Sequence, residues 1–332
     1  MHKRTIGKSL AILGGAIAIS STAAAAFADQ PLPLREWLTH PLATRSIPQH
    51  GMGYVPTDDA IFASSPRLSI KATREELPGQ LVLSDYLPPV ADQGRQESCV
   101  AWSAAYYCYS YAVGEKRHLT QDQLKDPKWE FSPAFLYNQI KAPGGGTNMG
   151  AAFKVLTEQG CATLAEMPYN QDDDSATPSP AAKARAAKFA DATVAYVFKY
   201  LQADPEAIKT YLVESHHPFT TAIPLFKDFP NGTVDPNFVY NLTVDPTRAN
   251  LEGGHAITIV GYDDSKHAFR LLNSWGPNWG DNGYMWISED FIQKFALEGW
   301  GEIAGGPSLR GFVRGGKVKV TPHMTLIEPT SK

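Results

Sequence analysis

The sequence is poor in cysteine and in charge, and each shortage argues against a class of protein. Three cysteines in 332 residues are too few for a disulfide-rich secreted scaffold. A net charge of −4 gives no reason to expect nucleic acid or an anionic membrane as a partner. Beyond residue 28, no apolar run approaches the ~18 residues of a membrane-spanning helix. The composition, 43% hydrophobic and 19% charged, is that of a globular protein.

The first 28 residues have the three parts of a secretory signal. A positively charged start is followed by an apolar run at residues 10–19 and a small-x-small cleavage site at Ala26-Phe27-Ala28. The alternative is an uncleaved anchor helix, which the short and interrupted apolar run disfavours. We therefore expect residues 1–28 to be removed and the mature protein to be secreted or periplasmic.

A polar loop then leads directly into a long uncharged stretch. Residues 93–98 end in Ser98, a good helix N-cap residue, and no charged side chain follows before Gly114. The pattern predicts a buried helix from Ser98 to Val113, ended by Gly114, with the Cys99 thiol in its first turn. A helix N-terminus favours thiolate, the nucleophilic form. A lone cysteine is nevertheless more often a small buried hydrophobe, so the assignment needs partners.

Those partners are found far downstream, in two short β-rich runs around His255 and Asn273. If the runs pair as an antiparallel hairpin centred on Asp264, opposed residues have numbers that sum to 528, and His255 faces Asn273. Opposed Cβ atoms lie about 5 Å apart, so the amide oxygen of Asn273 can hold one ring nitrogen while the other serves the thiol of Cys99. A slip of one residue would separate the two side chains. The pattern predicts a nucleophile, a base and an orienting group.

These residues, in this order, resemble the active-site blocks of the papain-like cysteine peptidases. The most specific block is residues 273–284, which read Asn-Ser-Trp-Gly-x-x-Trp-Gly-x-x-Gly-Tyr. Weaker similarity lies at residues 131–138, 144–146 and 152–160, and the whole resemblance covers roughly residues 77–300. It implies an α+β fold of papain-like two-lobe architecture, with a helical lobe, a β-barrel-like lobe and the active-site cleft between them.

The resemblance also implies roles for individual residues. Cys99 is the nucleophile, His255 the acid and base, Asn273 the orienting group and Gln93 a donor to the oxyanion, together with the Cys99 N–H. Trp275 would shield the His–Asn hydrogen bond from water. The implied substrate-binding residues are Gly145, Gly146, Ala222, Gly254 and Trp279. No metal or other cofactor is implied.

The sequence departs from the family pattern at two places. The residue after the nucleophile is Val100 instead of tryptophan, with Trp102 two places further on. The cysteine usual three residues before the nucleophile is Gln96, and its disulfide partner near Gly144 is missing. The chain therefore resembles a divergent, bacterial branch of the family.

The composition of the chain and the extent of the resemblance indicate the domain organisation. Residues 29–76 are proline-rich and irregular, and we expect this extension or short pro-segment to lie outside the catalytic core of residues 77–332. It is either a simple linker or an inhibitory segment that lies in the cleft. The remaining boundaries are a helical lobe at about 83–204, a β lobe at about 205–318 and a C-terminal tail at 319–332.

The regular elements that we expect beyond the first helix are set by capping residues and β-rich runs. The predicted helices are 132–140, 148–159 and 205–214. The predicted strands are 219–223, 239–241, 256–262, 269–273, 284–287 and 311–313, with a further edge strand after residue 315.

The remaining cysteines, histidines and aspartates give weaker indications of function. Cys108 and Cys161 either stay free and buried or form a disulfide, and free thiols are favoured. The adjacent pair His216-His217 does not suit a metal, since neighbours on a strand point opposite ways. The run Asp172 to Asp174 is a solvated loop.

The function that these patterns predict is that of an exported, monomeric cysteine peptidase, which cleaves peptides or proteins through a covalent acyl-enzyme. Two alternatives stay open. One is an acyltransferase or amidase of the same fold that acts on cell-wall peptides. The other is a catalytically silent peptide-binding homologue.

Overall fold

The computed structural model describes residues 33–39, 50–73, 77–303 and 316–330. The chain divides into two units, residues 1–34 and 35–332, and only Pro33 and Leu34 of the first are described. The predicted signal at 1–28 and the predicted strand at 311–313 lie outside the described residues. Among the helices that are described, none combines the length and hydropathy that a membrane span needs.

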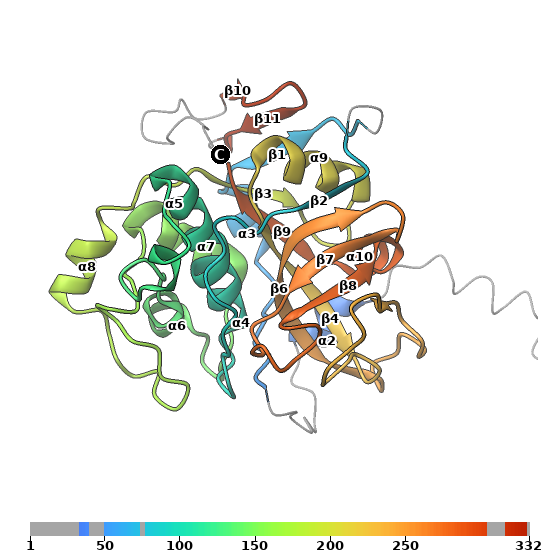
Figure 1. Cartoon of the computed structure of the whole chain (residues 1–332), viewed down its shortest axis with the longest axis horizontal. Helices are drawn as coiled ribbons and strands as arrows, with labels where there is room; N and C mark the ends of the chain where they lie inside the picture. Colours follow the sequence, from blue (N-terminus) through green and yellow to red (C-terminus); the bar gives the residue numbers. More distant parts are fainter. Residues whose placement is uncertain (1–32, 40–49, 74–76, 304–315, 331–332) are drawn as a thin grey trace, which may run out of the picture. The chain divides into compact units, whose positions relative to one another are not determined.

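Helices dominate the stretch between residues 99 and 186, as the sequence predicts. In Figure 1 the helices α5 to α8 lie together beside the strands β4, β6, β7 and β8. Ser132 and Asn148 cap α6 and α7 by accepting from the backbone N–H groups of Phe135 and Ala151. The helices of the unit and its flanks are α2 Leu34–Thr39, α3 Asp59–Ala63, α4 Cys99–Ala101, η1 Trp102–Tyr109, α5 Ser110–Arg117, η2 Gln123–Lys125, α6 Pro133–Ile140, α7 Met149–Gln159, α8 Pro180–Ala186, α9 Pro205–Ser215 and α10 Glu289–Phe295.

The central helix differs from its prediction in two ways. It begins at Cys99 as predicted, but its middle third, η1, is a π-helix, which is wider than an α-helix and is often found at functional sites. The predicted stop at Gly114 is wrong, because α5 continues to Arg117 and ends at His118, whose φ of 52° is left-handed. A Cβ at Gly114 would lie 3.1 Å from Leu124 Cδ2 and 3.2 Å from Tyr86 Cβ, so the small size of this residue serves packing.

The strands form one sheet of mostly antiparallel pairs. Their order is β10-β11-β1-β3-β9-β4-β6-β7-β8-β5, with β2 paired to β6. The bounds are β1 Arg67–Ile70, β2 Gln80–Val82, β3 Val194–Phe198, β4 Phe219–Phe226, β5 Val239–Tyr240, β6 Leu251–Asp263, β7 Ala268–Leu272, β8 Tyr284–Ser288, β9 Glu298–Glu302, β10 Lys317–Lys319 and β11 Met324–Ile327. Strands β4 and β6 are longer than predicted because they pair with each other from Phe219 to Phe226.

Both ends of the chain contribute to this sheet. Strand β1, from the extension that was expected to be irregular, pairs antiparallel with β11 and parallel with β3. The C-terminal stretch supplies the hairpin β10–β11, where the sequence predicted one edge strand and a loose tail. The part of the extension near residue 70 is therefore an integral strand of the fold.

The register of the hairpin β6–β7 is shifted from the predicted one. The two pairs before Val260, such as Thr258 with Leu272, have numbers that sum to 530, and the three pairs after it have numbers that sum to 531, instead of 528. Because a shift of two residues keeps side chains on the same face, His255 and Asn273 remain neighbours, diagonally instead of directly opposed. The register changes again at Val260, where a bulge lies between the pairs of Ile259 and Gly261.

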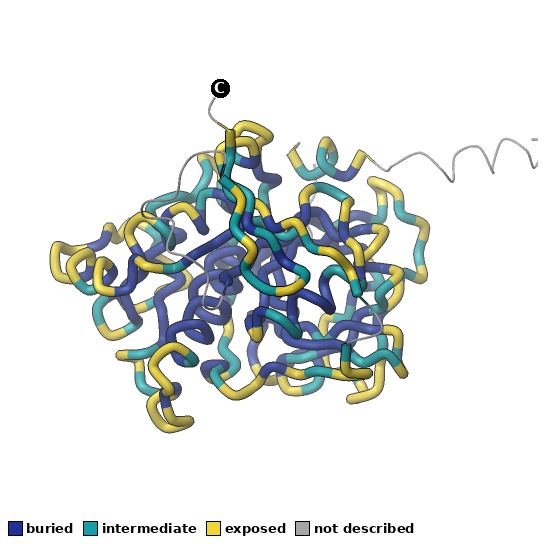
Figure 2. Tube along the Cα trace, turned by 90° about the horizontal axis from the view of Figure 1, so that it is seen from above, coloured by how far each residue is buried: buried dark blue, intermediate teal, exposed yellow. Residues whose placement is uncertain are grey.

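The core lies between the central helix and the sheet, where Figure 2 shows the buried residues concentrated. Every residue from Cys99 to Gly114 is buried. Ser103 on η1 makes polar contacts to both neighbouring strands, 3.0 Å from Oγ1 of Thr220 and 2.7 Å from Oγ1 of Thr258. These bonds fix the helix, and with it the thiol at its start, against strand β6.

Candidate active site

Cys99 lies at the first position of α4 and is 0% exposed. Its Sγ accepts a hydrogen bond from the backbone N–H of Ala256 at 3.4 Å. Burial raises the pKa of this thiol to about 12, so the sulfur is protonated in this structure. Ser98 does not cap the helix through its side chain as predicted; its hydroxyl lies 2.8 Å from that of Tyr169.

His255 lies on β6, one residue before Ala256, and is also 0% exposed. Its Nε2 donates to Oδ1 of Asn273 at 2.7 Å, because an amide oxygen can only accept. Nδ1 of the neutral ring is therefore a free acceptor, and it has no hydrogen-bond partner among the described residues. Burial lowers the pKa of His255 to about 4, against the opposing effect of the bond to Asn273.

Asn273 is held from several sides. Its Oδ1 also accepts from the backbone N–H of Ser274 at 2.8 Å, and its own carbonyl accepts from the hydroxyl of Tyr107 at 3.1 Å. The Trp275 ring lies 4.8 Å from the His255 ring, where the sequence places the shield of the His–Asn bond. The structure thus joins the imidazole to the carboxamide as the sequence predicts. The Cys99 sulfur contacts the backbone of the next residue, Ala256, and no hydrogen bond joins it to the His255 ring among the described residues.

Gln93 lies beside these residues and is fully buried. Its amide Nε2 donates to the carbonyls of Gly51 at 2.9 Å and Gln96 at 2.8 Å. Its Oε1 accepts from the Ser274 hydroxyl at 2.5 Å. Sequence reasoning assigned Ser274 no role, although this residue belongs to the most specific motif. In the structure, the hydroxyl of Ser274 binds the oxygen of the Gln93 amide and so turns the amide nitrogen towards the site.

The N-terminal segment 50–57 covers the site. On the sheet side, Tyr54 N–H donates to the Gly254 carbonyl at 3.2 Å. On the helical side, the segment pairs in parallel with Thr147, which donates to Gly53 at 2.8 Å and accepts from Val55 at 3.0 Å. The segment is therefore bonded to both halves of the fold, directly over Cys99.

Two glycines allow the segment to approach so closely. A Cβ at Gly51 would lie 2.2 Å from the Gln96 carbonyl oxygen, and one at Gly53 would lie 2.0 Å from that of Glu97. Both distances are far below van der Waals contact with rigid backbone. The two glycines on either side of Met52 were a signal of close backbone approach that the sequence reasoning did not use.

His50 closes the other end of the segment. Its ring stacks on Trp275 with centroids 5.2 Å apart, and its Nδ1 lies 3.3 Å from Oδ1 of Asp92. Asp92 precedes Gln93, so this contact lies beside the predicted oxyanion donor. Neither His50 nor Asp92 was predicted to belong to the site.

The predicted substrate-binding residues fall into two groups. Gly145 and Gly146 have positive φ, and a Cβ at Gly146 would lie 2.5 Å from the Gly53 carbonyl oxygen, so this loop borders the segment together with Gly254. Ala222 is fully buried opposite Ala256 on β4. Trp279 is 2% exposed, and its indole N–H donates to the Pro230 carbonyl at 2.9 Å. These last two residues present little surface to a ligand in this state.

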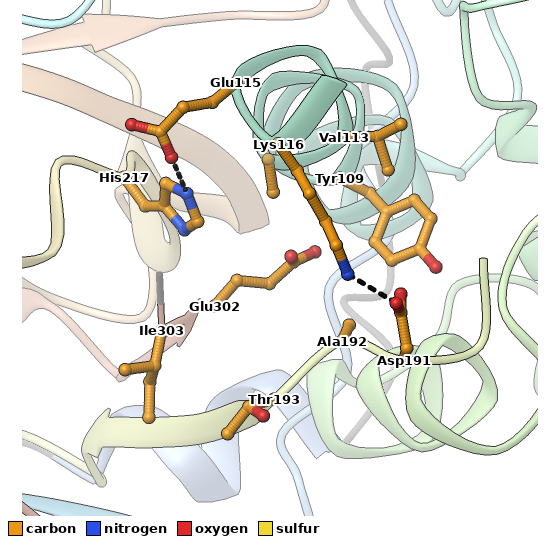
Figure 3. A pocket seen from close by; sticks show the side chains of 11 residues that line it. Tyr109, Val113, Glu115, Lys116, Asp191, Ala192, Thr193, His217, Glu302 and Ile303 are labelled. Atoms are coloured by element: carbon orange, nitrogen blue, oxygen red, sulfur yellow. Dashed lines mark hydrogen bonds and ion pairs between the residues drawn. The ribbon is translucent and has the colours of Figure 1, made fainter. Parts of the chain in front are cut away.

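A separate cavity of about 310 Å³ lies at the far end of the central helix (Figure 3). Glu115 Oε2 lies 2.7 Å from Nε2 of His217, and Lys116 forms an ion pair with Asp191 across the opening. Glu115 is thus the partner of His217. The two histidines do not lie on a strand as predicted, because His216 ends α9 with a φ of 55° and β4 begins only at Phe219. Glu302 points into the cavity, and burial raises the pKa of its carboxyl well above the usual range.

The remaining candidate sites are also accounted for. All three cysteines are free and buried, so no disulfide joins Cys108 and Cys161. Within the described ranges, no three His, Cys, Asp or Glu side chains cluster in a way that suits a metal ion. Asp172 pairs with Arg95 at 2.8 Å, which anchors the loop beside the start of the central helix.

Comparisons with known proteins agree with this geometry. The family model described as "Papain family cysteine protease" matches residues 83–298. Cathepsin B-like CP3 of Giardia intestinalis is 28% identical over 246 residues, which cover 68% of this chain and 73% of that protein. Two further curated relatives are matched over 44% and 63% of their own length.

Solved structures resemble the fold. Xylellain, a cysteine protease from Xylella fastidiosa, has a TM-score of 0.63 at 24% identity, covering 81% of this chain and 100% of its own. Procathepsin B S9 from Trypanosoma congolense has a TM-score of 0.53 at 18% identity, covering 82% and 88%.

Proposed function

Because the chain belongs to the papain family of cysteine proteases, we propose that it is an exported peptidase that hydrolyses peptide bonds through Cys99, His255 and Asn273. One observation carries this proposal. The imidazole of His255 is bound at Nε2 by Asn273 and keeps Nδ1 free, while the Cys99 sulfur is held by the N–H of the very next residue, Ala256. Nucleophile, base and orienting group then act as one set.

The reaction is an acyl transfer to water. His255 Nδ1 takes the proton of the Cys99 thiol, and the thiolate attacks the carbonyl carbon of a peptide bond. The developing oxyanion is stabilised by Gln93 Nε2 and the Cys99 N–H. The imidazolium protonates the leaving amine, and water, deprotonated by His255, then releases the acyl group from sulfur. Asn273 keeps the ring in the required tautomer throughout.

In this proposal the segment 50–57 holds the enzyme latent. It leaves the Cys99 and His255 side chains with 0% exposure, and its Gly51 carbonyl takes the Gln93 donor that an oxyanion needs. Burial also keeps both reactive groups neutral, with a thiol pKa of about 12 and an imidazole pKa of about 4. Activity then requires that the segment leave the site. Removal of residues 1–28 on export remains a prediction from the sequence.

A comparison of the secreted wild-type protein with Cys99→Ala tests the proposal. Intact-mass measurement reports signal removal and self-cleavage in one experiment, and we expect the variant to keep its extension. Hydrolysis of casein and of peptide substrates should be lost in Cys99→Ala, and a thiol probe should label the active wild-type protein at Cys99. Undiminished hydrolysis by the variant would refute the role of Cys99. Product analysis with amine acceptors and with purified peptidoglycan separates a peptidase from an acyltransferase or amidase.

A further inference from the structure

Glu302, the last residue of β9, carries a buried carboxyl whose Oε1 has no partner. The residue is 6% exposed, and this oxygen makes no hydrogen bond with any described residue. In Figure 3 the carboxyl points into the cavity of about 310 Å³, between the ion pair of His217 and the ion pair of Lys116. A buried carboxyl is unfavourable unless a cation or hydrogen-bond donors compensate for it, so the fold keeps this group at a cost in stability.

The charged groups around the cavity leave Glu302 without a counter-ion. Among the described residues that line it, the carboxyls are Glu115, Asp191 and Glu302, whereas Lys116 is the one permanent cation. The Nζ of Lys116 is bound to Asp191. Burial, and then the charge of Asp191, raise the pKa of Glu302 well above its usual range, against the opposing charge of Lys116. Glu302 therefore keeps a proton at pH values at which an exposed glutamate is ionised.

His217 carries a second acceptor without a partner. The hydrogen bond from His217 lowers the pKa of Glu115, so this carboxyl is ionised and can only accept. Nε2 of His217 therefore donates to it, at 2.7 Å. Nδ1 of the neutral ring is then an acceptor, and it has no hydrogen-bond partner among the described residues.

A small organic cation has the chemistry that these two acceptors need. Ammonium and guanidinium groups carry several N–H donors and no acceptor, so one such group has enough donors for Glu302 and for His217. The side chains of Ala112, Val113 and Ile303 line the same cavity and suit a short hydrocarbon body. A volume of about 310 Å³ lies at the lower end of the range of ligand pockets, which favours a small molecule.

We propose that this cavity binds a small organic cation, with Glu302 as the counter-ion of its ammonium or guanidinium group and His217 as a second acceptor. On binding, the carboxyl of Glu302 gives its proton to the solvent and remains as a carboxylate beside the cation. One proton therefore leaves for each ligand that enters, and binding strengthens as pH rises towards the raised pKa of Glu302. The cavity lies at the end of the central helix opposite Cys99, so the proposal does not depend on the peptidase reaction.

Other titratable groups face Glu302 from the elements packed around it. They are Cys108 and Tyr109 of η1, Glu115 and Lys116 of α5, Asp191, Tyr211 of α9 and His217. Burial raises the pKa values of Cys108, Tyr109 and Tyr211, so these groups stay neutral while Glu302 titrates. A histidine can exchange a proton near neutral pH, and a comparison with Glu302→Gln subtracts the contribution of His217.

Isothermal titration calorimetry tests the proposal on the full chain carrying Cys99→Ala, in which self-cleavage through Cys99 is ruled out. The probe is n-propylguanidine, and its matched control is n-propylurea, which has the same shape and no charge. Titrations at several pH values, in two buffers of different ionisation enthalpy, give the Kd and the number of protons released. Glu302→Gln removes the carboxyl, and Glu130→Gln is the control, because Glu130 is a buried carboxyl that already accepts from the Tyr106 hydroxyl at 2.9 Å.

We expect propylguanidine to bind at least about tenfold more tightly than propylurea. Close to one proton should be released per ligand, and the Kd should fall by up to about tenfold per pH unit as pH rises towards the raised pKa. Glu302→Gln should weaken binding by at least about tenfold and abolish the proton release, and Glu130→Gln should change neither. Equal affinities for the two probes, or proton release that survives Glu302→Gln, overturn the proposal. The comparison with propylurea and the proton count need only the parent chain, so the test stands even where a variant fails to fold.

The chain itself carries two guanidinium groups soon after Ile303, those of Arg310 and Arg314, which lie outside the described residues. The double variant Arg310→Gln/Arg314→Gln therefore distinguishes a free ligand from a side chain of the protein. We expect its Kd for propylguanidine to equal that of the parent chain. Binding that appears only in the double variant would show that an arginine of the chain fills the cavity, which overturns the proposal.

Discussion

Replacing Gly53 by alanine should open the active site of the full chain. The new Cβ would lie 2.0 Å from the Glu97 carbonyl oxygen and 2.5 Å from its carbon, both rigid backbone atoms. Residue 53 cannot stay in place, and its bonds to Thr147 at 2.8 Å and to Gly254 at 3.4 Å are lost or weakened, as is the neighbouring bond of Val55. The catalytic side chains lie on other residues, although the change also disturbs the contact of the Gly53 backbone with the Cys99 thiol.

The size of the effect follows from these contacts. Three backbone hydrogen bonds contribute about 0.5–1.5 kcal/mol each, so the closed state should lose about 1.5–4.5 kcal/mol relative to the open one. This corresponds to an open population that rises about 10- to 1,600-fold. The rate at which a small neutral alkylating agent modifies Cys99 should rise in the same proportion, since only the open state exposes the thiol.

Peptide mass spectrometry after timed alkylation provides the assay and its controls. Cys108 and Cys161 are buried away from the segment and report global unfolding. Gly79→Ala is the matched variant, because a Cβ at Gly79 meets no atom within 4 Å. The segment does not close the site through these contacts if Cys99 is alkylated no faster in Gly53→Ala than in Gly79→Ala. The same conclusion follows if all three cysteines are alkylated at the same rate.

Three further predictions follow from the same contacts. The hydroxyl of Tyr54 donates to the buried carboxylate of Glu298 at 2.7 Å. Tyr54→Phe removes this donor and should raise the rate of Cys99 alkylation by about tenfold or more, whereas an unchanged rate would show that this bond does not hold the segment. Asn273→Ala should lower kcat by about 10- to 100-fold, less than the 10²–10⁴-fold contribution of general acid–base catalysis, and a complete loss would mean that it does more than orient His255. Glu302 has a raised pKa when folded, so its stabilising contribution is present below the unfolded pKa near 4.5 and is lost as pH rises. As pH rises from the unfolded pKa near 4.5 towards the raised folded pKa, the unfolding free energy of the wild-type protein should fall by about 1.4 kcal/mol per pH unit, and Glu302→Gln should remove this fall. Parallel wild-type and variant curves in denaturant titrations would contradict this.

The central helix and the His–Asn pair could be predicted because local patterns specify them. An uncharged run after Ser98 indicates a buried helix, and two β-rich runs joined by a turn indicate a hairpin. The predicted register was wrong because the turn lies further along the chain than predicted: the pairs next to it have numbers that sum to 531 instead of 528, and the bulge at Val260 brings the sum to 530 for the pairs beyond it. The pairing survived because an even shift preserves the face. A shift of one would have separated His255 from Asn273.

The contacts of the N-terminal segment could not be predicted in the same way. Tyr54 and Glu298 are separated by 244 positions, and neither stands in a motif. A glutamate in a β-rich run reads as an exposed residue, because burial of a carboxylate is unfavourable unless donors from elsewhere compensate. Strand β1 was likewise missed, since its partners β3 and β11 lie far along the chain. These pairings depend on tertiary structure and carry no local signal, whereas the close approach of the segment is signalled only by Gly51 and Gly53.

In the latent state that we propose, the segment 50–57 uses the catalytic apparatus without distorting it. The Gln93 amide, which is to hold an oxyanion, donates to the Gly51 carbonyl, and the Gly254 carbonyl, which borders the site, accepts from Tyr54. Ser274 fixes the Gln93 amide and Asn273 fixes the imidazole while the segment is bound, and both contacts lie outside the segment. Departure of the segment therefore frees donors and acceptors that are already oriented, because none of these side chains has to change its partners within the fold. In this proposal, latency consists of occupied hydrogen-bonding groups and buried, neutral reactive groups, and removal of the segment 50–57 is expected to reverse both.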